Sequence, residues 1–73
     1  MKDIKIYTTE WCSSCVLAKK ALEDGGHSYK EINIEKEGIS RKELKEITGR
    51  LEVPSIIIDG VNIGGFENLI QII

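Results

Sequence analysis

Two cysteines, Cys12 and Cys15, are the residues of this 73-residue chain whose type and spacing best fit a chemical role. Cys12 directly follows a short extended run and is expected to begin a helix. Backbone N–H groups at a helix start point toward such a sulfur, and the helix dipole favours negative charge there. The thiolate is the nucleophile of disulfide exchange, and Cys15, one helical turn on, can displace a group attached to Cys12. The spacing therefore indicates a redox-active pair.

Three other roles for this cysteine pair have to be weighed. A purely structural disulfide would stabilise little, because closing a loop of about four residues is worth only ~1.9 kcal/mol of chain entropy. A closed zinc site needs four ligands, and His27 is the only other soft ligand in the chain. A two-thiolate Cu(I) site stays open, although a small metallochaperone domain would not account for the segments downstream.

Composition narrows the class of protein. Ten Lys and Arg residues face twelve Asp and Glu residues, a net charge of −2. Nucleic-acid binding needs a basic face, so neither DNA nor RNA is expected as a partner. No segment has the ~20 apolar residues of a membrane span, and the N-terminus lacks the apolar run of a signal peptide. We expect a single domain over residues 1–73, monomeric and cytoplasmic, where thiols are kept reduced and cysteine pairs are more often chemical than structural.

The elements around the cysteines follow from hydrophobic periodicity. Alternation of apolar and charged residues predicts a first strand that ends near Thr9. Cys12–Asp24 is predicted as a helix that ends at Gly25 and Gly26, and Tyr29–Ile34 as a second strand. A strand, a crossover helix and a strand imply a parallel βαβ unit. The apolar side of the helix is expected to hold Val16, Leu17, Ala18, Ala21 and Leu22.

The second half begins with the clearest local signal. Ser40 and Glu43 have the spacing of a capping box, at the start of a helix predicted over Ser40–Thr48 and ended by Gly49. Ile39 and Leu44 have the spacing of a hydrophobic staple, and the helix stripe is expected to hold Leu44, Ile47 and Leu51.

A hairpin and a short helix complete the chain. Asp59 and Gly60 are typical of a two-residue hairpin turn, here between strands at Ser55–Ile58 and Val61–Ile63. Because the first of these strands is apolar without alternation, it is expected to be covered on both faces. The last helix is predicted from the spacing of Phe66, Leu69, Ile70 and Ile73.

The cysteine pair, the element order and the downstream segments together resemble a glutaredoxin over essentially the whole chain. The resemblance implies an α/β, thioredoxin-like fold of order β-α-β-α-β-β-α, with a four-stranded mixed sheet flanked by three helices. It also implies a thiol–disulfide oxidoreductase that uses glutathione as co-substrate, needs no bound cofactor and acts on disulfide-containing proteins. The matching segments are Ile6-Tyr7-Thr8, Ala18-Lys19, Gly49-Arg50, Val53-Pro54, Ile63-Gly64-Gly65 and Glu67.

The same resemblance assigns roles to individual residues. The matching proline in the family is cis, so Pro54 is expected to turn the N–H and C=O of Val53 toward the cysteinyl part of glutathione. Amides that follow Gly65 would hold the γ-glutamyl carboxylate. Arg50 would clamp the glycine carboxylate, unless it only faces solvent. The expected catalytic residues are Cys12 and Cys15, no metal ligand is expected, and the expected glutathione-binding residues are Thr9, Trp11, Ser14, Arg50, Glu52, Val53, Pro54, Gly65, Phe66 and Glu67.

Several residues depart from the family pattern near the expected glutathione site. The family usually has Lys at Thr9 and Thr at Glu52, so this chain loses a cation and gains an anion there. We therefore predict that the pKa of Cys12 is lowered less than is usual in glutaredoxins. The remaining departures are Ser13-Ser14 for Pro-Tyr, Asn68 for an acidic residue, and Trp11, which is more typical of thioredoxins.

These departures leave two alternative functions open. A weaker glutathione site and Trp11 would suit a glutaredoxin-like redoxin that is recharged by thioredoxin reductase. Because Ser13 replaces the motif proline, the chain could instead carry a [2Fe–2S] cluster across a dimer, held by Cys12 of each subunit and two glutathiones.

Overall fold

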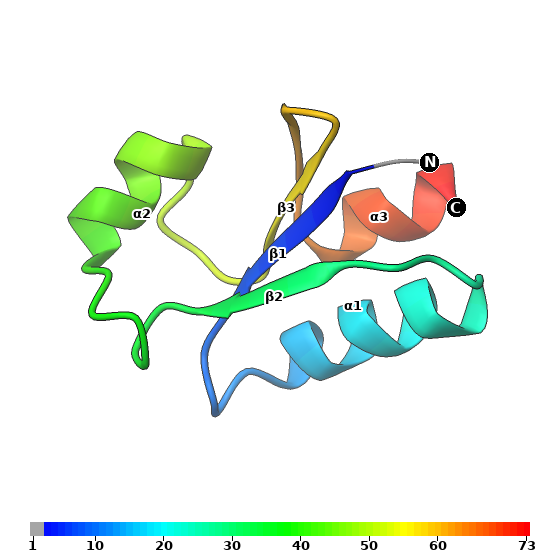
Figure 1. Cartoon of the computed structure of the whole chain (residues 1–73), viewed down its shortest axis with the longest axis horizontal. Helices are drawn as coiled ribbons and strands as arrows, with labels where there is room; N and C mark the ends of the chain where they lie inside the picture. Colours follow the sequence, from blue (N-terminus) through cyan, green and yellow to red (C-terminus); the bar gives the residue numbers. More distant parts are fainter. Residues whose placement is uncertain (1–2) are drawn as a thin grey trace.

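The structure, a computed structural model, describes residues 3–73 as a four-stranded sheet with helices on both faces (Figure 1). The elements are β1 (Ile4–Thr8), α1 (Ser13–Asp24), β2 (Lys30–Asn33), α2 (Arg41–Thr48), β3 (Ser55–Ile58), β4 (Val61–Gly64) and α3 (Phe66–Ile72). The strand order is β2-β1-β3-β4, with β1 parallel to β2 and antiparallel to β3, and with β3 antiparallel to β4. This topology confirms the expected thioredoxin-like fold.

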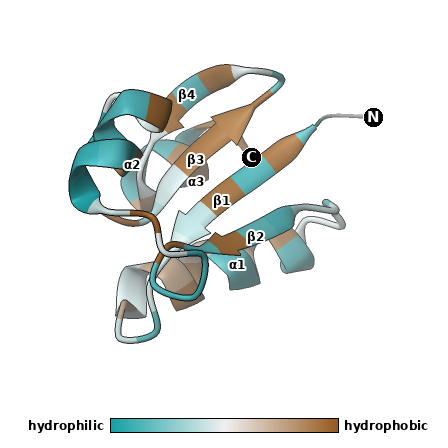
Figure 2. Cartoon of the chain, turned by 60° about the vertical axis from the view of Figure 1, so that its left-hand side comes forward, coloured by the Kyte–Doolittle hydropathy of each residue, from teal (hydrophilic) through white to brown (hydrophobic). Residues whose placement is uncertain are grey.

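Two hydrophobic clusters hold the layers together, one on each face of the sheet. Helices α1 and α3 pack on one face, and α2 packs on the other. Figure 2 shows the hydrophobic β3 beside β1, whose hydropathy alternates. The first cluster consists of Ile4, Ile6, Ala18, Leu22, Ile56, Ile58 and Leu69. The second consists of Tyr7, Ile34 and Leu44, with Ile39, Val53 and Ile57 packed against them. Strand β3 is therefore covered on both faces, as its unbroken apolar run predicts.

The predicted local signals are present. The Ser40 hydroxyl accepts a hydrogen bond from the Glu43 N–H, and the Glu43 carboxylate accepts one from the Ser40 N–H, both at 3.1 Å. Gly49 ends α2 in the left-handed conformation, at φ 82°. At the hairpin, Asp59 and Gly60 both have positive φ, 51° and 82°, as the two-residue turn requires. These turns and caps fix the lengths of α2 and of the β3–β4 hairpin.

Some predicted apolar faces are only partly correct. In α1, Ala18 and Leu22 are buried and Ala21 packs against the first cluster, as expected, while Val16 and Leu17 are 57% and 49% exposed. The buried stripe begins at Cys15, whose side chain turns inward in the first turn.

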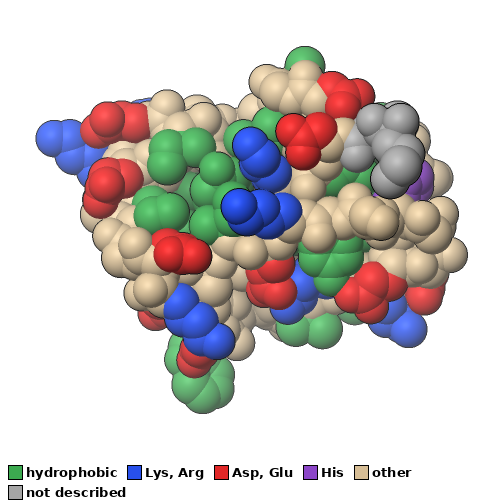
Figure 3. Space-filling model, viewed as in Figure 1, with side chains coloured by type: hydrophobic (Ala, Val, Ile, Leu, Met, Phe, Trp, Pro, Cys, Tyr) green, Lys and Arg blue, Asp and Glu red, His purple; other side chains and the backbone are tan. Residues whose placement is uncertain are grey.

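Helices α2 and α3 show the same kind of difference. Helix α2 buries Leu44 and Thr48, and this i, i+4 stripe leaves Ile47 and Leu51 at the surface. Figure 3 shows hydrophobic side chains exposed around α2. Helix α3 buries Leu69 and packs Phe66 against the first cluster, as expected, while Ile70 and the C-cap residue Ile73 are exposed. Within residues 3–73 no helix is long and apolar enough to cross a membrane.

Candidate active site

Cys12 lies at the end of the loop that joins β1 to α1. It is the N-cap residue of α1, with an extended backbone, and its sulfur accepts a hydrogen bond from the Cys15 N–H at 3.1 Å. The sulfur thus takes the place that a hydroxyl or carboxylate oxygen usually has at a helix start. This geometry confirms the expectation that an amide of the first turn faces the Cys12 sulfur, and such a donor favours the thiolate.

The two cysteines are joined in a disulfide, and their Cα atoms are 5.2 Å apart. Their exposures differ: Cys12 is only half-buried, while Cys15, on the inner face of α1, is 1% exposed. An incoming disulfide or thiol can therefore reach the Cys12 sulfur and not the Cys15 sulfur. The site has one accessible sulfur and one inner sulfur.

The Val53–Pro54 segment lies beside the accessible sulfur through the Val53 carbonyl. The peptide bond between these two residues is cis, as the family resemblance implies, and Pro54 is buried. The Cys12 sulfur lies 3.6 Å from the Val53 carbonyl oxygen. In the reduced protein the Cys12 thiol can donate its hydrogen to this oxygen. A carbonyl so placed favours the thiol, and it opposes the effect of the Cys15 amide on the thiolate.

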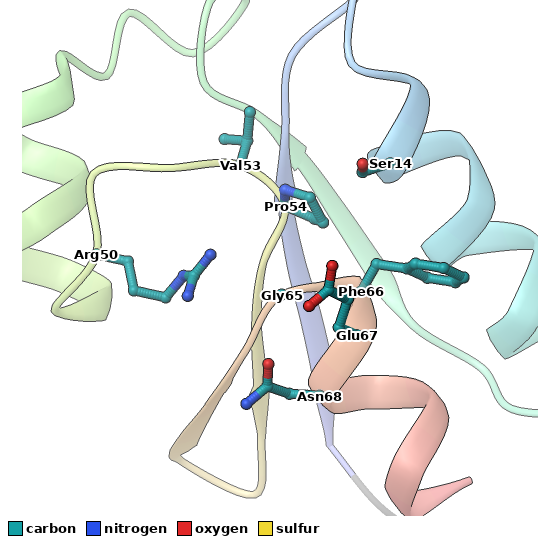
Figure 4. Close-up of a pocket in the computed structure, with 8 residues that line it drawn as sticks. All are labelled: Ser14, Arg50, Val53, Pro54, Gly65, Phe66, Glu67 and Asn68. Atoms are coloured by element: carbon teal, nitrogen blue, oxygen red, sulfur yellow. The ribbon is translucent and has the colours of Figure 1, made fainter.

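An open groove of about 280 Å³ begins at this point. Figure 4 shows that it runs between the start of α1, the loop before β3 and the start of α3. Most of the residues expected to bind glutathione line it, but Thr9, Trp11 and Glu52 do not. Asn68, noted from the sequence as a departure near this site but not as a binding residue, also lines it, and its side chain packs over Gly64. The lining residues are Ser14, Arg50, Val53, Pro54, Gly65, Phe66, Glu67 and Asn68.

Arg50 supplies the positive charge of the groove lining. Its guanidinium and the Glu67 carboxylate both point into the groove in Figure 4. A guanidinium nitrogen lies 3.2 Å from the place that a Cβ atom on Gly65 would take, so a side chain there would displace Arg50. Among the described residues, the Arg50 Nε is buried without a hydrogen-bond partner. A buried unpaired donor costs free energy until an acceptor reaches it, and a ligand carboxylate would be such an acceptor.

The residues outside the groove have other contacts. Trp11 is 89% exposed in the loop between β1 and α1. The carboxylate of the neighbouring Glu10 lies 3.6 Å from the Lys36 ammonium. This ion pair offsets part of the negative charge that Glu10 would otherwise bring near the cysteines. Thr9 is half-buried, and the Glu52 side chain is exposed.

Lys19, the cation of α1 closest in sequence to the cysteines, is paired as well. Its ammonium lies 2.9 Å from the Glu31 carboxylate, which also accepts a hydrogen bond from the Thr8 hydroxyl at 2.8 Å. Burial raises the pKa of Glu31, but the hydrogen bonds from Lys19 and Thr8 and the Lys19 charge outweigh burial and lower it below 4.5. Because the Lys19 charge is offset, it contributes little to the Cys12 thiolate.

The lowered pKa of Glu31 predicts a dependence of stability on pH. A carboxyl whose pKa is lower in the folded chain stabilises the fold fully above its unfolded pKa of 4.5 and loses this effect as pH falls through the folded pKa. We expect Glu31→Gln to lower the free energy of unfolding at pH 6 and to change it much less at pH 3. Urea unfolding at the two pH values measures this, with Glu37→Gln as the control. An equal loss at both values would contradict the pairing.

Comparison with known proteins places this arrangement in a family. The Glutaredoxin family model matches residues 4–63. The chain is 39% identical to Glutaredoxin 3 of Escherichia coli over 69 aligned residues. The alignment covers 94% of this chain and 83% of that protein. The chain is 36% identical over 69 residues to the glutaredoxin of Pseudomonas aeruginosa, with 94% and 82% covered.

Solved structures agree with this assignment. Wheat glutaredoxin superposes with a TM-score of 0.81 at 30% identity, covering 93% of this chain and 67% of that one. A buckwheat glutaredoxin–glutathione complex superposes with a TM-score of 0.83 at 24% identity, covering 96% of this chain and 66% of that one, and at this identity it shows the fold alone. The family match, the shared fold and the Cys12–Cys15 pair together show that the chain belongs to the glutaredoxin family of glutathione-dependent thiol–disulfide oxidoreductases.

Proposed function

We propose that this glutaredoxin reduces glutathione and protein mixed disulfides, with Cys12 as the nucleophile and Cys15 as the resolving thiol. The observation that carries the proposal is the difference in exposure between the two sulfurs, since only Cys12 is accessible. The Cys12 thiolate attacks a substrate sulfur, the substrate disulfide breaks, and the leaving thiolate takes up a proton. A mixed disulfide on Cys12 remains.

Two routes lead onward from this mixed disulfide. Where the adduct is glutathione, a free glutathione thiolate attacks the glutathione sulfur, so that glutathione disulfide leaves and the Cys12 thiolate is regenerated. Where the adduct is a protein, the Cys15 thiolate attacks the Cys12 sulfur, releases the substrate thiol and forms the Cys12–Cys15 disulfide. One glutathione thiolate then opens this disulfide at Cys12, and a second attacks the glutathione sulfur of the adduct. Glutathione disulfide leaves, and both cysteines are reduced again. The two electrons come from two glutathione thiols, so no bound cofactor is needed.

Glutathione would lie in the groove beside Val53. The N–H and C=O of Val53 would pair with its cysteinyl unit as a short added strand, and the sulfur would then face Cys12. The free donor of Arg50 would bind a glutathione carboxylate, and Gly65 leaves room for it. A buckwheat glutaredoxin of the same fold was solved in complex with glutathione, which supports glutathione as the ligand. Thr9, Trp11 and Glu52 would contribute only at the edge of the groove.

We propose that the protein acts as a monomer in the cytoplasm. Its proposed activity is tested by glutathione-coupled reduction of hydroxyethyl disulfide. Glutathione reductase and NADPH report each glutathione disulfide formed. We expect saturable turnover, and we expect thioredoxin reductase to leave the oxidised protein unreduced. Failure of glutathione-coupled turnover, together with reduction by thioredoxin reductase, would contradict the proposal.

A further inference from the structure

The segment from residue 49 to residue 54 presents Arg50 and Val53 to the groove although it contains neither helix nor strand. A buried hydroxyl lies at each end of it. Thr48, the last residue of α2, is 4% exposed, and Ser55, the first residue of β3, is fully buried. Because the mechanism above uses neither hydroxyl, their burial calls for another explanation.

The Ser55 hydroxyl acts on the peptide unit next to the active site. It donates a hydrogen bond to the Glu52 carbonyl at 2.7 Å and so closes the turn over Val53 and Pro54. Ser55 pairs with Tyr7 of β1 in the sheet, so its own backbone is fixed. The turn is thereby attached to the two central strands of the sheet.

The Glu52 carbonyl and the Val53 N–H belong to the same peptide unit. A peptide unit is planar, and in its trans form the C=O and N–H point in opposite directions. When the Glu52 carbonyl is held by Ser55, the direction of the Val53 N–H is therefore fixed as well. The next carbonyl along, that of Val53, lies 3.6 Å from the Cys12 sulfur. The Ser55 hydrogen bond therefore fixes the Val53 N–H through the shared peptide unit, and it closes the turn that carries the Val53 carbonyl.

We propose that Ser55 is a positioning residue of the active site: through the Glu52 carbonyl, its hydroxyl aims the Val53 N–H into the groove and holds the Val53 carbonyl against the Cys12 sulfur. The part that concerns glutathione rests on the proposed function, because it requires that glutathione pairs with Val53. The part that concerns the Cys12 thiol does not.

Thr48 provides the matched control. Its hydroxyl donates to the Leu44 carbonyl at 2.8 Å and accepts from the Arg50 N–H at 3.1 Å. It is therefore also a buried hydroxyl that holds this segment, but its bonds end before the Glu52–Val53 peptide. Thr48→Val removes this hydroxyl at nearly constant volume, as Ser55→Ala removes the other. Both variants should lose stability.

Two readouts separate positioning from mere stabilisation. Ser55→Ala should raise KM for the glutathione-containing disulfide about fivefold, with kcat changed less than about twofold, as expected for one lost hydrogen bond. In a Cys15→Ser background, the ultraviolet absorbance of the thiolate reports the titration of Cys12. Since the Val53 carbonyl favours the thiol, Ser55→Ala should lower the titration midpoint by about 0.5 pH unit. Thr48→Val should leave this midpoint unchanged, and Ser55→Thr should restore it.

The titration decides the matter even without glutathione turnover. If the wild-type protein lacked that turnover, the proposed function would fail, yet the Cys12 midpoint would still test Ser55. The proposal is overturned if Ser55→Ala is folded and titrates as the wild type does. It is equally overturned if Ser55→Ala and Thr48→Val shift the midpoint by the same amount, because the effect would then follow stability alone.

Discussion

Replacing Cys12 with serine is expected to abolish disulfide exchange, with a loss of at least about 1,000-fold in rate. A serine hydroxyl does not ionise near neutral pH, and the remaining Cys15 sulfur is 1% exposed, so no substrate can reach it. Cys15→Ser should behave differently. It keeps the accessible sulfur and the Cys15 amide that faces it, so it should still reduce glutathione mixed disulfides.

The comparison needs both substrate types. The Cys15→Ser variant should lose the route that forms the intramolecular disulfide, and mixed disulfides with protein substrates should accumulate on Cys12. Mass spectrometry detects these adducts, and hydroxyethyl disulfide turnover measures the glutathione route. Ser13→Ala, a change at an exposed residue between the cysteines, controls for disturbance of the helix start. If Cys15→Ser were as inactive as Cys12→Ser toward glutathione mixed disulfides, the assignment of roles would be wrong.

Local signals determined most of the fold that the sequence predicts. The Ser40–Glu43 capping box and the Asp59–Gly60 turn depend on residues within a few positions of each other, and both form as expected. The rotation of the helices does not depend on such neighbours. Cys15 and Thr48 are buried for reasons of tertiary contact, one on the inner face of α1 and one as a hydroxyl bridge. The predicted stripes left both residues out and instead included Val16, Leu17 and Ile47, which the fold exposes.

The candidate site was predictable from motifs but not in its detail. Motif residues such as Val53, Pro54 and Gly65 line the groove because the family backbone brings them there. Ser55 follows the motif directly, yet nothing in the sequence shows that its hydroxyl turns back to Glu52. Asn68 was noted only as a departure from the family, and its contact with Gly64 needed the folded chain.

Electrostatics of the site required the structure for the same reason. From the sequence, Lys19 counts as a cation that could favour the Cys12 thiolate, although two helical turns away. In the fold it faces Glu31 of the neighbouring strand at 2.9 Å. The Lys19 charge is therefore offset by Glu31 and contributes little at Cys12. Neither partner reveals the contact by its position in the chain, because β2 meets α1 only after the crossover.

Arg50→Met is expected to raise KM for glutathione-containing disulfides roughly 10- to 100-fold while leaving kcat nearly unchanged. Hydrogen bonds to a charged group are worth about 1.5–3 kcal/mol, and a ligand carboxylate would lose the only cation of the groove lining that residues 3–73 supply. Arg50→Lys should recover part of the loss, because a single ammonium keeps the charge without the paired geometry of a guanidinium. Lys42→Met removes an equal charge from the exposed side of α2 and should leave KM unchanged.

The same substitution also makes a prediction about stability, which separates binding from folding. The Arg50 Nε is buried without a partner in the described chain, so methionine removes an unsatisfied donor and keeps the aliphatic stem. Urea unfolding without glutathione should therefore show Arg50→Met to be at least as stable as the wild type, although its KM is higher. A destabilised variant with unchanged KM would mean that Arg50 supports the segment before β3 and that glutathione carboxylates are bound elsewhere.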